Sequence, residues 1–166
     1  MDDQLVKEIN DKLDVISVLN KYEIEFGVLQ EDEFIPVKVN VLNPDNTTSE
    51  VDMTIGDIMY FTEKGTITIP PRPILNDCLL WVNQQINRII DKIVDGVFNG
   101  FWTEERIDSE MFAFGLQIQD HARMLLENMI RSSTNLSSLL DQTNENQFLY
   151  DLNKLKNHIK CKIIKK

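Results

Sequence analysis

The chain has 166 residues, 42% of them hydrophobic, and a net charge of −10 at pH 7. The length and apolar content suit one domain with its own core, and so acidic a body repels phosphates, which argues against ordinary nucleic-acid binding. No run approaches the roughly 18 apolar residues that a membrane span needs, and the start Met1-Asp2-Asp3-Gln4-Leu5 lacks the basic and apolar segments of a signal peptide. We therefore expect one domain over residues 1–166, made in a cytoplasm and without contact to a membrane.

The first quarter of the chain changes from a helical period to a period of two. An amphipathic helix is predicted over residues 3–20 by Leu5, Ile9, Leu13, Ile16 and Leu19. Alternating apolar residues predict strands over 22–29 and 35–41. The turn Asn43-Pro44-Asp45-Asn46 follows, so we expect a hairpin over residues 31–53 that projects from the body, with its return strand near 43–53.

Residues 54–73 contain a helix start followed by a stiff segment. Thr54-Ile55-Gly56-Asp57 is similar to a capping box and predicts a short helix that ends near Gly65. Residues 66–73 include three prolines, which fix φ and remove backbone donors, so we expect an extended connector. Pro73 is then expected as the first residue of a long helix.

Two long helices are predicted over residues 73–98 and 103–131. The first has a stripe that is expected to be buried on more than one side, from Leu75, Leu79, Leu80, Val82, Ile86, Ile89, Ile90, Ile93, Val94 and Val97. The second has a seam of near-heptad spacing, from Ile107, Met111, Phe114, Ile118, Ala122, Leu125 and Met129. Polar residues 131–147 predict a flexible loop. Residues 148–166 predict a helical turn and a strand over 158–163.

These elements together predict an α+β fold. A small antiparallel sheet is expected to pack against two long helices, with an N-terminal helix and a projecting hairpin added to them.

Residues suited to catalysis or metal binding do not form a recognisable constellation. The two histidines, His121 and His158, stand in no known catalytic motif, and Cys78 and Cys161 stand in no CxxC spacing, which indicates reduced thiols. The acidic residues at 104, 105, 108 and 110 fit a solvated helix start better than a metal or acid–base cluster. We expect no catalytic residue, no cofactor and no metal, and therefore no enzyme.

Two other side chains deserve a prediction. Arg72 stands between two prolines that fix its direction, which favours either a bidentate pair with a carboxylate or simple solvation of the connector. Trp81 is expected in the core, whereas Trp102 is expected either to pack or to act as an exposed interface anchor.

Three groups of residues, in this order, resemble one family. The first is Phe26-Gly27-Val28-Leu29. The second is a short helix followed by Glu63-Lys64-Gly65-Thr66 and Ile69-Pro70-Pro71-Arg72-Pro73. The third is Leu149-Tyr150-Asp151-Leu152-Asn153-Lys154-Leu155. This series is similar to the tail-completion, or virion-morphogenesis, proteins of tailed phages, which stand at the head–tail joint. The chain departs from their pattern at Lys64, Ile74 and Leu152-Asn153.

The resemblance implies a structural subunit of the virion neck that forms a ring, commonly a hexamer, between neighbouring neck, connector and tail proteins. Candidates for subunit-interface or structural roles are Glu63, Gly65, Thr66, Pro70, Pro71, Arg72, Pro73 and Trp102. DNA would pass through the lumen without specific binding, and we expect acidic residues there, namely Glu31, Asp32, Glu33 and Asp45.

The charge along the chain suggests how such a ring closes. Residues 1–66 carry −10 and residues 146–166 carry +5. A ring needs two different faces of each subunit, so the acidic N-terminal region and the basic tail are expected to pair between neighbours. A solvated face is the other interpretation of the basic tail.

Three alternatives stay open. Within the virion, the chain is expected to be a tail terminator or a head-side stopper if it is not the tail-completion ring. The net charge also suits an acidic DNA mimic that inhibits a host protein. A carboxylate-dependent hydrolase is the third alternative, which the missing constellation disfavours.

Overall fold

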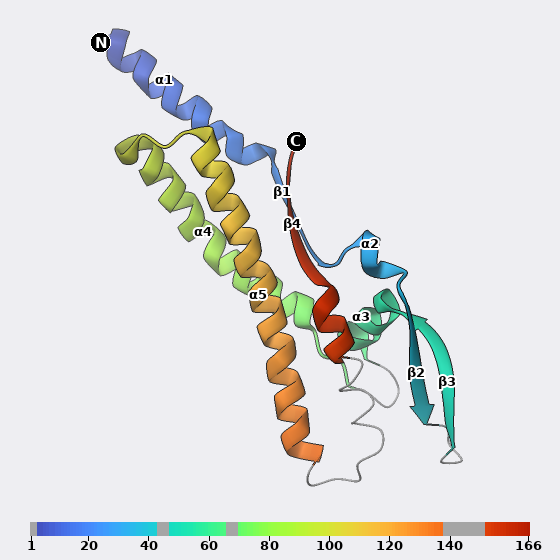
Figure 1. The fold of residues 1–166 in the computed structure, drawn as a ribbon. Helices are drawn as coiled ribbons and strands as arrows, with labels where there is room; N and C mark the ends of the chain where they lie inside the picture. Colours follow the sequence, from blue (N-terminus) through green and yellow to red (C-terminus); the bar gives the residue numbers. More distant parts are fainter. Residues whose placement is uncertain (1–2, 43–46, 66–69, 138–151) are drawn as a thin grey trace. The chain divides into compact units, whose positions relative to one another are not determined.

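The computed structural model describes residues 3–42, 47–65, 70–137 and 152–166. The fold is α+β, as predicted, and is dominated by the long helices α4 (Ile74–Gly100) and α5 (Glu104–Ser137) (Figure 1). No helix among these residues is long and apolar enough to cross a membrane.

The chain divides into two compact units. Unit 1 comprises residues 1–25, 79–118 and 161–166, and unit 2 comprises residues 26–78 and 119–160. The chain passes between the units within β1 (Tyr22–Val28), α4, α5 and β4 (Ile159–Lys165). The single domain expected over residues 1–166 stays a prediction.

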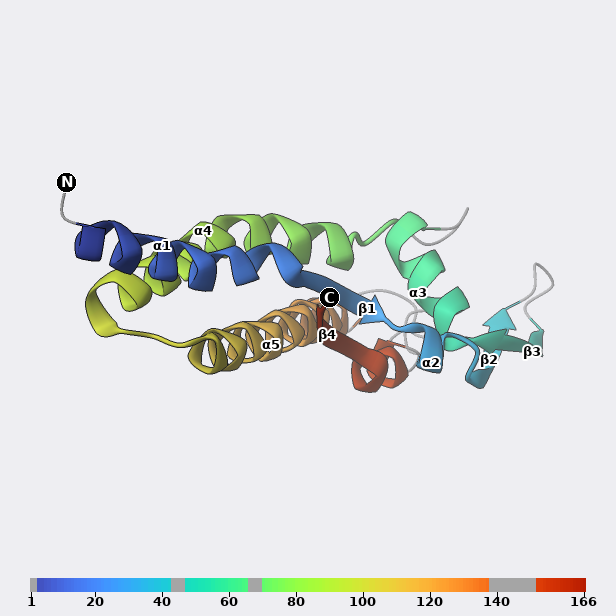
Figure 2. The same cartoon turned by 90° about the horizontal axis from the view of Figure 1, so that it is seen from above.

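Unit 1 is built on an antiparallel pair of helix segments, namely the end of α4 and the start of α5, which are joined by a short turn between Gly100 and Glu104 (Figure 2). Its core cluster consists of Ile93, Val97, Ile107 and Met111. Helix α1 (Asp3–Ser17) continues into a 3-10 turn, η1 (Val18–Lys21), so the helix predicted over residues 3–20 is confirmed. Residues from the end of α1 and from η1 pack against the cluster.

Strands β1 and β4 form a two-stranded sheet. The Lys166 N–H donates to the Lys21 carbonyl at 2.8 Å, which joins the end of β4 to the start of β1, so the strands run antiparallel. The predicted C-terminal strand is therefore confirmed, although it begins at Ile159 because residues 152–158 are helical.

Unit 2 contains the predicted hairpin. Strands β2 (Pro36–Leu42) and β3 (Thr48–Thr54) are antiparallel, with Val39 opposite Val51. Helix α3 (Ile55–Lys64) follows at once, as expected. A short helix that the sequence did not predict, α2 (Gln30–Glu33), separates β1 from β2, so the described strands form two separate pairs and not one sheet.

The helix boundaries differ from the prediction in two places. Helix α4 begins at Ile74, and Pro73 precedes it, with its carbonyl accepting from the Asp77 N–H at 2.9 Å. Helix α5 continues from Arg131 to Ser137, so the part of the predicted loop up to residue 137 is helical. Extending a long helix costs little once it has formed, which outweighs the weak helix preference of Ser, Thr and Asn.

The burial of the long helices also corrects the predicted stripes. On α5, Leu126 is fully buried where Leu125 was expected, because the seam follows a period nearer 3.6 than 3.5. On α4, Leu79, Leu80 and Ile90 are exposed, so this helix is not buried on more than one side in the single chain.

Both cysteines are thiols. Cys78 is buried in α4, and Cys161 is half-buried in β4.

Candidate functional site

The connector between α3 and α4 is tied back to α3 by backbone hydrogen bonds. Gly65 follows α3 with a φ of 74°, a conformation that favours glycine, and its N–H donates to the Phe61 carbonyl at 2.9 Å. The Arg72 N–H donates to the Thr62 carbonyl at 2.7 Å. Two described residues of the connector, Gly65 and Arg72, are therefore bonded to the last turn of α3.

Glu63 links α3 to the first turn of α4. Its carboxylate Oε1 accepts a hydrogen bond from the Leu75 N–H at 2.5 Å. That N–H is one of the donors at a helix start that have no acceptor inside the helix. Burial raises the pKa of the Glu63 carboxyl, while this hydrogen bond opposes the change. Glu63 is thus a capping residue of α4.

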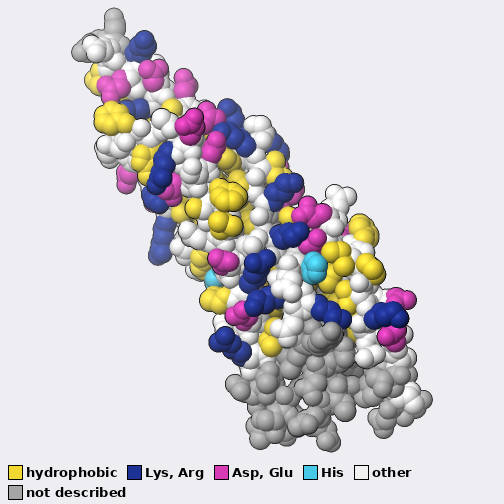
Figure 3. All heavy atoms as spheres, in the orientation of Figure 1, with side chains coloured by type: hydrophobic (Ala, Val, Ile, Leu, Met, Phe, Trp, Pro, Cys, Tyr) yellow, Lys and Arg dark blue, Asp and Glu magenta, His cyan; other side chains and the backbone are white. Residues whose placement is uncertain are grey.

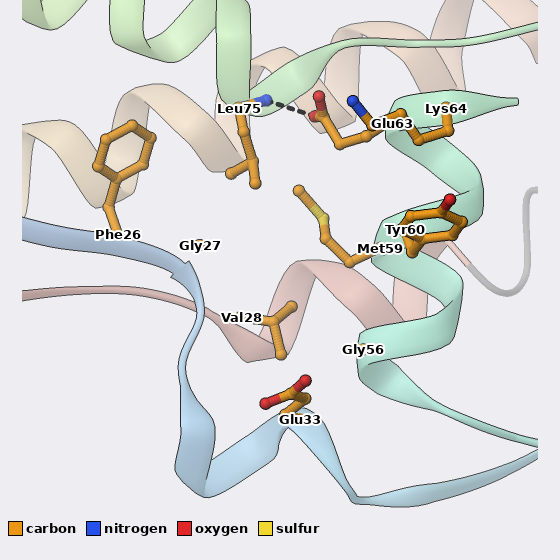
Figure 4. Close-up of a pocket in the computed structure, with 10 residues that line it drawn as sticks. All are labelled: Phe26, Gly27, Val28, Glu33, Gly56, Met59, Tyr60, Glu63, Lys64 and Leu75. Carbon is orange, nitrogen blue, oxygen red and sulfur yellow. Dashed lines mark hydrogen bonds between the residues drawn. The ribbon is translucent and has the colours of Figure 1, made fainter.

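An open pocket of about 400 Å³, which we call the motif pocket, lies beside the end of α3 and the first turn of α4 (Figure 4). Its walls come from the end of β1, from α2, from α3 and from the first turn of α4. The lining residues are Phe26, Gly27, Val28, Glu33, Gly56, Met59, Tyr60, Glu63, Lys64 and Leu75. In Figure 4 the Leu75, Met59 and Val28 side chains point toward one another, and Glu33 lies at the edge near Gly56. The pocket brings Gly27 and Val28 of the first motif together with Glu63 and Lys64 of the second.

Two glycines allow the walls of the motif pocket to approach closely. Gly27 has a φ of 123°, and a Cβ there would lie 3.3 Å from Leu75 Cδ2. A Cβ on Gly56 would lie 2.7 Å from Glu33 Cγ. A side chain at Gly56 would displace α2 from α3, whereas at Gly27 the φ of 123° is itself the stronger constraint, because Leu75 could yield by a few tenths of an ångström. The Gly-Val step of the first motif therefore has a conformational reason in this chain.

The lining of the motif pocket combines apolar side chains with two carboxylates, one ammonium and the Tyr60 ring. Elsewhere in the described part of the chain, no group of three or more His, Cys, Asp or Glu side chains is placed to hold a metal ion.

Trp102 was predicted as an interface or structural residue together with residues 63–73. It belongs to unit 1 and is not one of the residues that line the motif pocket. The backbone N–H of Trp102 donates to the Gly96 carbonyl at 3.0 Å, and the indole ring packs against the core cluster. The Lys92 ammonium and the Arg106 guanidinium lie 5.9 Å and 5.1 Å from the ring centroid. Trp102 thus fastens the turn between α4 and α5, which favours packing over an exposed anchor. Phe101, next to it, is exposed.

Trp81 is only partly buried, although the core was expected. Its ring stacks on that of Phe114, with centroids 6.4 Å apart.

Of the acidic residues expected in a channel, Glu31 and Asp32 form ion pairs within the chain. Asp32 is buried, its Oδ2 lies 2.9 Å from Lys160 Nζ, and it lies 3.1 Å from His158 Nδ1. Glu31 also pairs with Lys160, at 3.0 Å. The Lys160 ammonium holds the pKa of the Asp32 carboxyl below its usual value. Glu33 lines the motif pocket.

This cluster of Glu31, Asp32, His158 and Lys160 was missed at the level of sequence. The only signal was the opposite charge of the 31–33 run and the basic tail, and the prediction placed that pairing between neighbouring subunits.

Other lysines of the basic tail also pair within the chain. Lys165 Nζ lies 2.7 Å from both Glu104 and Asp108, and Lys166 Nζ lies 2.5 Å from Glu23. Lys156 pairs with Glu127. The charges that were expected to join neighbours thus hold β4 and the helix before it to their own chain.

The remaining sequence candidates are placed as follows. Pro70, Pro71 and Pro73 are exposed, and Arg72 is half-buried. Thr66 and Asp45 lie outside the described residues. In the third motif, Leu152 and Leu155 are fully buried, which makes them core positions of unit 2.

Comparisons of this chain with protein-family models, with curated proteins and with solved structures found no match.

Proposed function

We propose that the chain is a structural subunit of the head–tail joint of a tailed phage. It assembles with copies of itself into a ring, commonly six-fold in the family that it resembles, which helps attach the tail to the capsid and surrounds the passage of the DNA. In this role it binds neighbouring neck, connector and tail proteins, acts within the virion, and catalyses no reaction.

The observation that carries the proposal is the convergence of the family-like residues. Gly27 and Val28 stand 35 or more positions before Glu63 and Lys64 in the chain, yet they line the same pocket. Gly65 and Arg72 of the segment that follows both donate backbone hydrogen bonds to carbonyls of α3. Motif residues that meet in space support the resemblance more strongly than a chance series would, because each then has a physical reason for its position.

The exposed apolar residues support assembly. Several large side chains lie exposed on α1, α4 and α5 of the single chain, among them Leu5, Leu13, Leu80, Phe112 and Leu116. Apolar patches on the surface of a soluble chain commonly mark protein–protein contacts. A subunit that works only in an assembly has such surfaces because its neighbours cover them.

The DNA-mimic alternative is disfavoured by the ion pairs. A mimic needs a face of unpaired carboxylates, whereas Glu23, Asp32, Glu104, Asp108 and Glu127 all pair with lysines of the C-terminal segment. A tail-terminator ring in the same virion remains the nearest rival, and it shares the property of self-assembly.

The mass of the purified chain in solution tests the proposal. Light scattering at rising concentration, together with negative-stain imaging, is expected to reveal a closed ring of several subunits with a central hole. The same measurement on the chain mixed with a basic protein tests the DNA-mimic alternative, which predicts a complex of the two. A chain that is monomeric at every concentration and binds the basic protein with defined stoichiometry contradicts the ring.

A further inference from the structure

The hairpin of unit 2 has two edges, one along each strand. The Ile55 N–H donates to the Ile35 carbonyl at 3.0 Å, so these residues form a directly hydrogen-bonded pair at the base of the hairpin. In an antiparallel ladder such pairs alternate with pairs whose N–H and C=O groups face away from the partner strand. Continued along the register, this alternation assigns the outward-facing backbone groups to Pro36, Lys38 and Asn40 on β2 and to Glu50, Asp52 and Thr54 on β3.

The edge of β2 is protected against further pairing. Pro36 has no N–H with which to bond another strand, and proline is one of the residues that keep sheet edges unpaired. The Lys38 carbonyl accepts a hydrogen bond from the Lys154 ammonium at 3.3 Å. A strand added to this edge would therefore find one donor missing and one acceptor occupied.

The edge of β3 lacks such protection along its middle. The Thr54 N–H, at the end of the strand, is bonded to the Asp57 carboxylate at 2.9 Å. Glu50 and Asp52 are exposed, and within the described ranges no strand other than β2 pairs with β3. The pairing with β2 is one-to-one over the 7 residues of β3, without a bulge that would turn the edge aside. The outward backbone groups of Glu50 and Asp52 can therefore bond a third strand.

One face of β3 is acidic. Because side chains alternate along a strand, Glu50 and Asp52 lie on the same face of the hairpin, together with Lys38 of β2. The Lys38 ammonium pairs with Glu50, so the two carboxylates exceed the one ammonium there. In Figure 3 acidic side chains flank a basic one at the lower right, where Figure 1 places the hairpin. A strand beside β3 meets this face with least repulsion if its own charges are positive.

The other face of β3 is apolar and partly open. Val51 and Met53 stand on it, next to Val39 and Val37 of β2. Val39 is 8% exposed, whereas Val51, directly opposite, is 40% exposed. The apolar face is therefore covered over β2 and open over β3. An added strand with apolar residues on this side would remove part of the Val51 surface from water.

We propose that β3 binds an extended segment of another protein as a third strand, in which lysine or arginine alternates with apolar residues. The backbone of Glu50 and Asp52 supplies the hydrogen bonds, their carboxylates select the basic side chains, and Val51 packs against the apolar ones. The inference goes beyond the ring proposed above and does not depend on it. A second copy of β3 does not fit, because Glu50 and Asp52 of the two chains would lie side by side.

A short blocked peptide of alternating lysine and valine tests the site. Hydrogen exchange, resolved by residue with NMR, is measured on the chain with and without this peptide. The amides of Glu50 and Asp52 are expected to exchange more slowly by roughly tenfold or more when the peptide saturates the edge, because each gains a hydrogen bond. The Val51 amide, already bonded to β2, is expected to change little. A peptide with glutamate in place of lysine is expected to leave all three amides unchanged.

A matched pair of proline variants tests the backbone contact. Glu50→Pro removes an outward N–H of β3, and Asn40→Pro removes the outward N–H of the residue opposite it on β2. Neither group bonds the partner strand, so the amide protection at Val39 and Val51 is expected to persist in both variants. Peptide affinity is expected to fall by roughly tenfold in Glu50→Pro and to stay unchanged in Asn40→Pro. Equal losses in the two variants overturn the proposal.

A charge variant keeps the test decisive if a proline disrupts the hairpin. Glu50→Gln with Asp52→Asn retains both outward amides and is expected to lower the preference for the lysine peptide over the glutamate peptide several-fold. An undiminished preference shows that the rest of the acidic chain attracts the peptide, and overturns selection by β3. Protection of the same two amides that grows with the concentration of the chain alone identifies a second copy as the occupant, which also overturns the proposal. Peptide binding without protection at these amides does the same.

Discussion

At the level of single residues, the closest packing in unit 1 is that of Trp102 over Gly96. A Cβ built on Gly96 would lie 2.3 Å from Trp102 Cδ2, which no real contact tolerates. The indole also packs against the core cluster, and the Lys92 and Arg106 cations lie within 6 Å of its ring, which limits how far it can move. The turn between the two long helices therefore depends on a residue without a side chain in the last turns of α4.

Gly96→Ala is expected to destabilise the chain by about 1–3 kcal/mol, because the added methyl group overpacks the site. Denaturant unfolding measures this change, and the fluorescence of the native state is expected to shift as Trp102 becomes more exposed to solvent. Gly100→Ala is the matched control, since a Cβ there would stand 3.2 Å from the same ring and needs only a small adjustment. Equal effects of both substitutions contradict this account.

Asp32 makes the second prediction at this scale. Because Lys160 lowers the pKa of its carboxyl, the ionised form is favoured in the folded state, with His158 and Glu31 also facing the site. The stability from this group is therefore present above the ordinary Asp pKa of about 3.9, and is lost as the pH falls below it. Asp32→Asn is expected to lower the thermal midpoint at pH 7.

The difference in thermal midpoint between Asp32→Asn and the wild type is expected to shrink as the pH falls and the Asp32 carboxyl of the wild type becomes protonated. Thermal melts in a series of buffers check this, with Asp91→Asn on the exposed face of α4 as the control. A difference that stays constant over the whole acidic range indicates a role for Asp32 other than its charge.

At the level of elements, α3 shows how much a local signal can determine. Thr54 and Asp57 form the full capping box, with the Thr54 hydroxyl accepting from the Asp57 N–H at 3.1 Å and the Asp57 carboxylate accepting from the Thr54 N–H at 2.9 Å. Gly65 closes the other end. Both ends of this helix were predictable because the groups that fix them are close neighbours in the sequence.

Thr54→Ala is expected to cost about 1 kcal/mol, through the loss of the acceptor for the Asp57 N–H. Because α3 provides one wall of the motif pocket, hydrogen exchange is expected to rise first at its amino end. Ser109→Ala is the control, since it removes a hydroxyl from within α5 without removing a cap. A loss no larger than that of the control would show that the box contributes little.

The features that the sequence did not reveal depend on partners far away in the chain. Helix α2 carries Asp32, which is held by Lys160, more than a hundred positions further on. Likewise, Glu63 was a candidate from its motif, but its bond to the Leu75 N–H joins two helices that are twelve positions apart at this point. Local caps and periods were readable, whereas long-range ion pairs and packing were not.

At the level of the whole molecule, charge decides how copies approach one another. The basic tail, which was expected to offset the acidic region of a neighbour, has four of its lysines in ion pairs within the chain. Two copies therefore meet as bodies of net charge −10, and apolar contacts have to overcome their repulsion. Salt shortens the range of that repulsion, to about 8 Å at physiological ionic strength.

Self-assembly is accordingly expected to strengthen as sodium chloride is raised from low to physiological concentration. Light scattering at a fixed protein concentration is expected to show a several-fold rise in the assembled fraction. Assembly that weakens with salt would instead indicate ion pairs between the copies, as the charge distribution along the sequence first suggested.

The two thiols give unit 1 and unit 2 separate chemical reporters. Burial raises the pKa of Cys78 to about 11, so almost no thiolate is present at pH 7, while Cys161 is only half-buried in β4. An alkylating reagent is therefore expected to modify Cys161 first, and to reach Cys78 only when the amino end of α4 opens. The delay between the first and the second adduct therefore measures the rate of local unfolding at the amino end of α4.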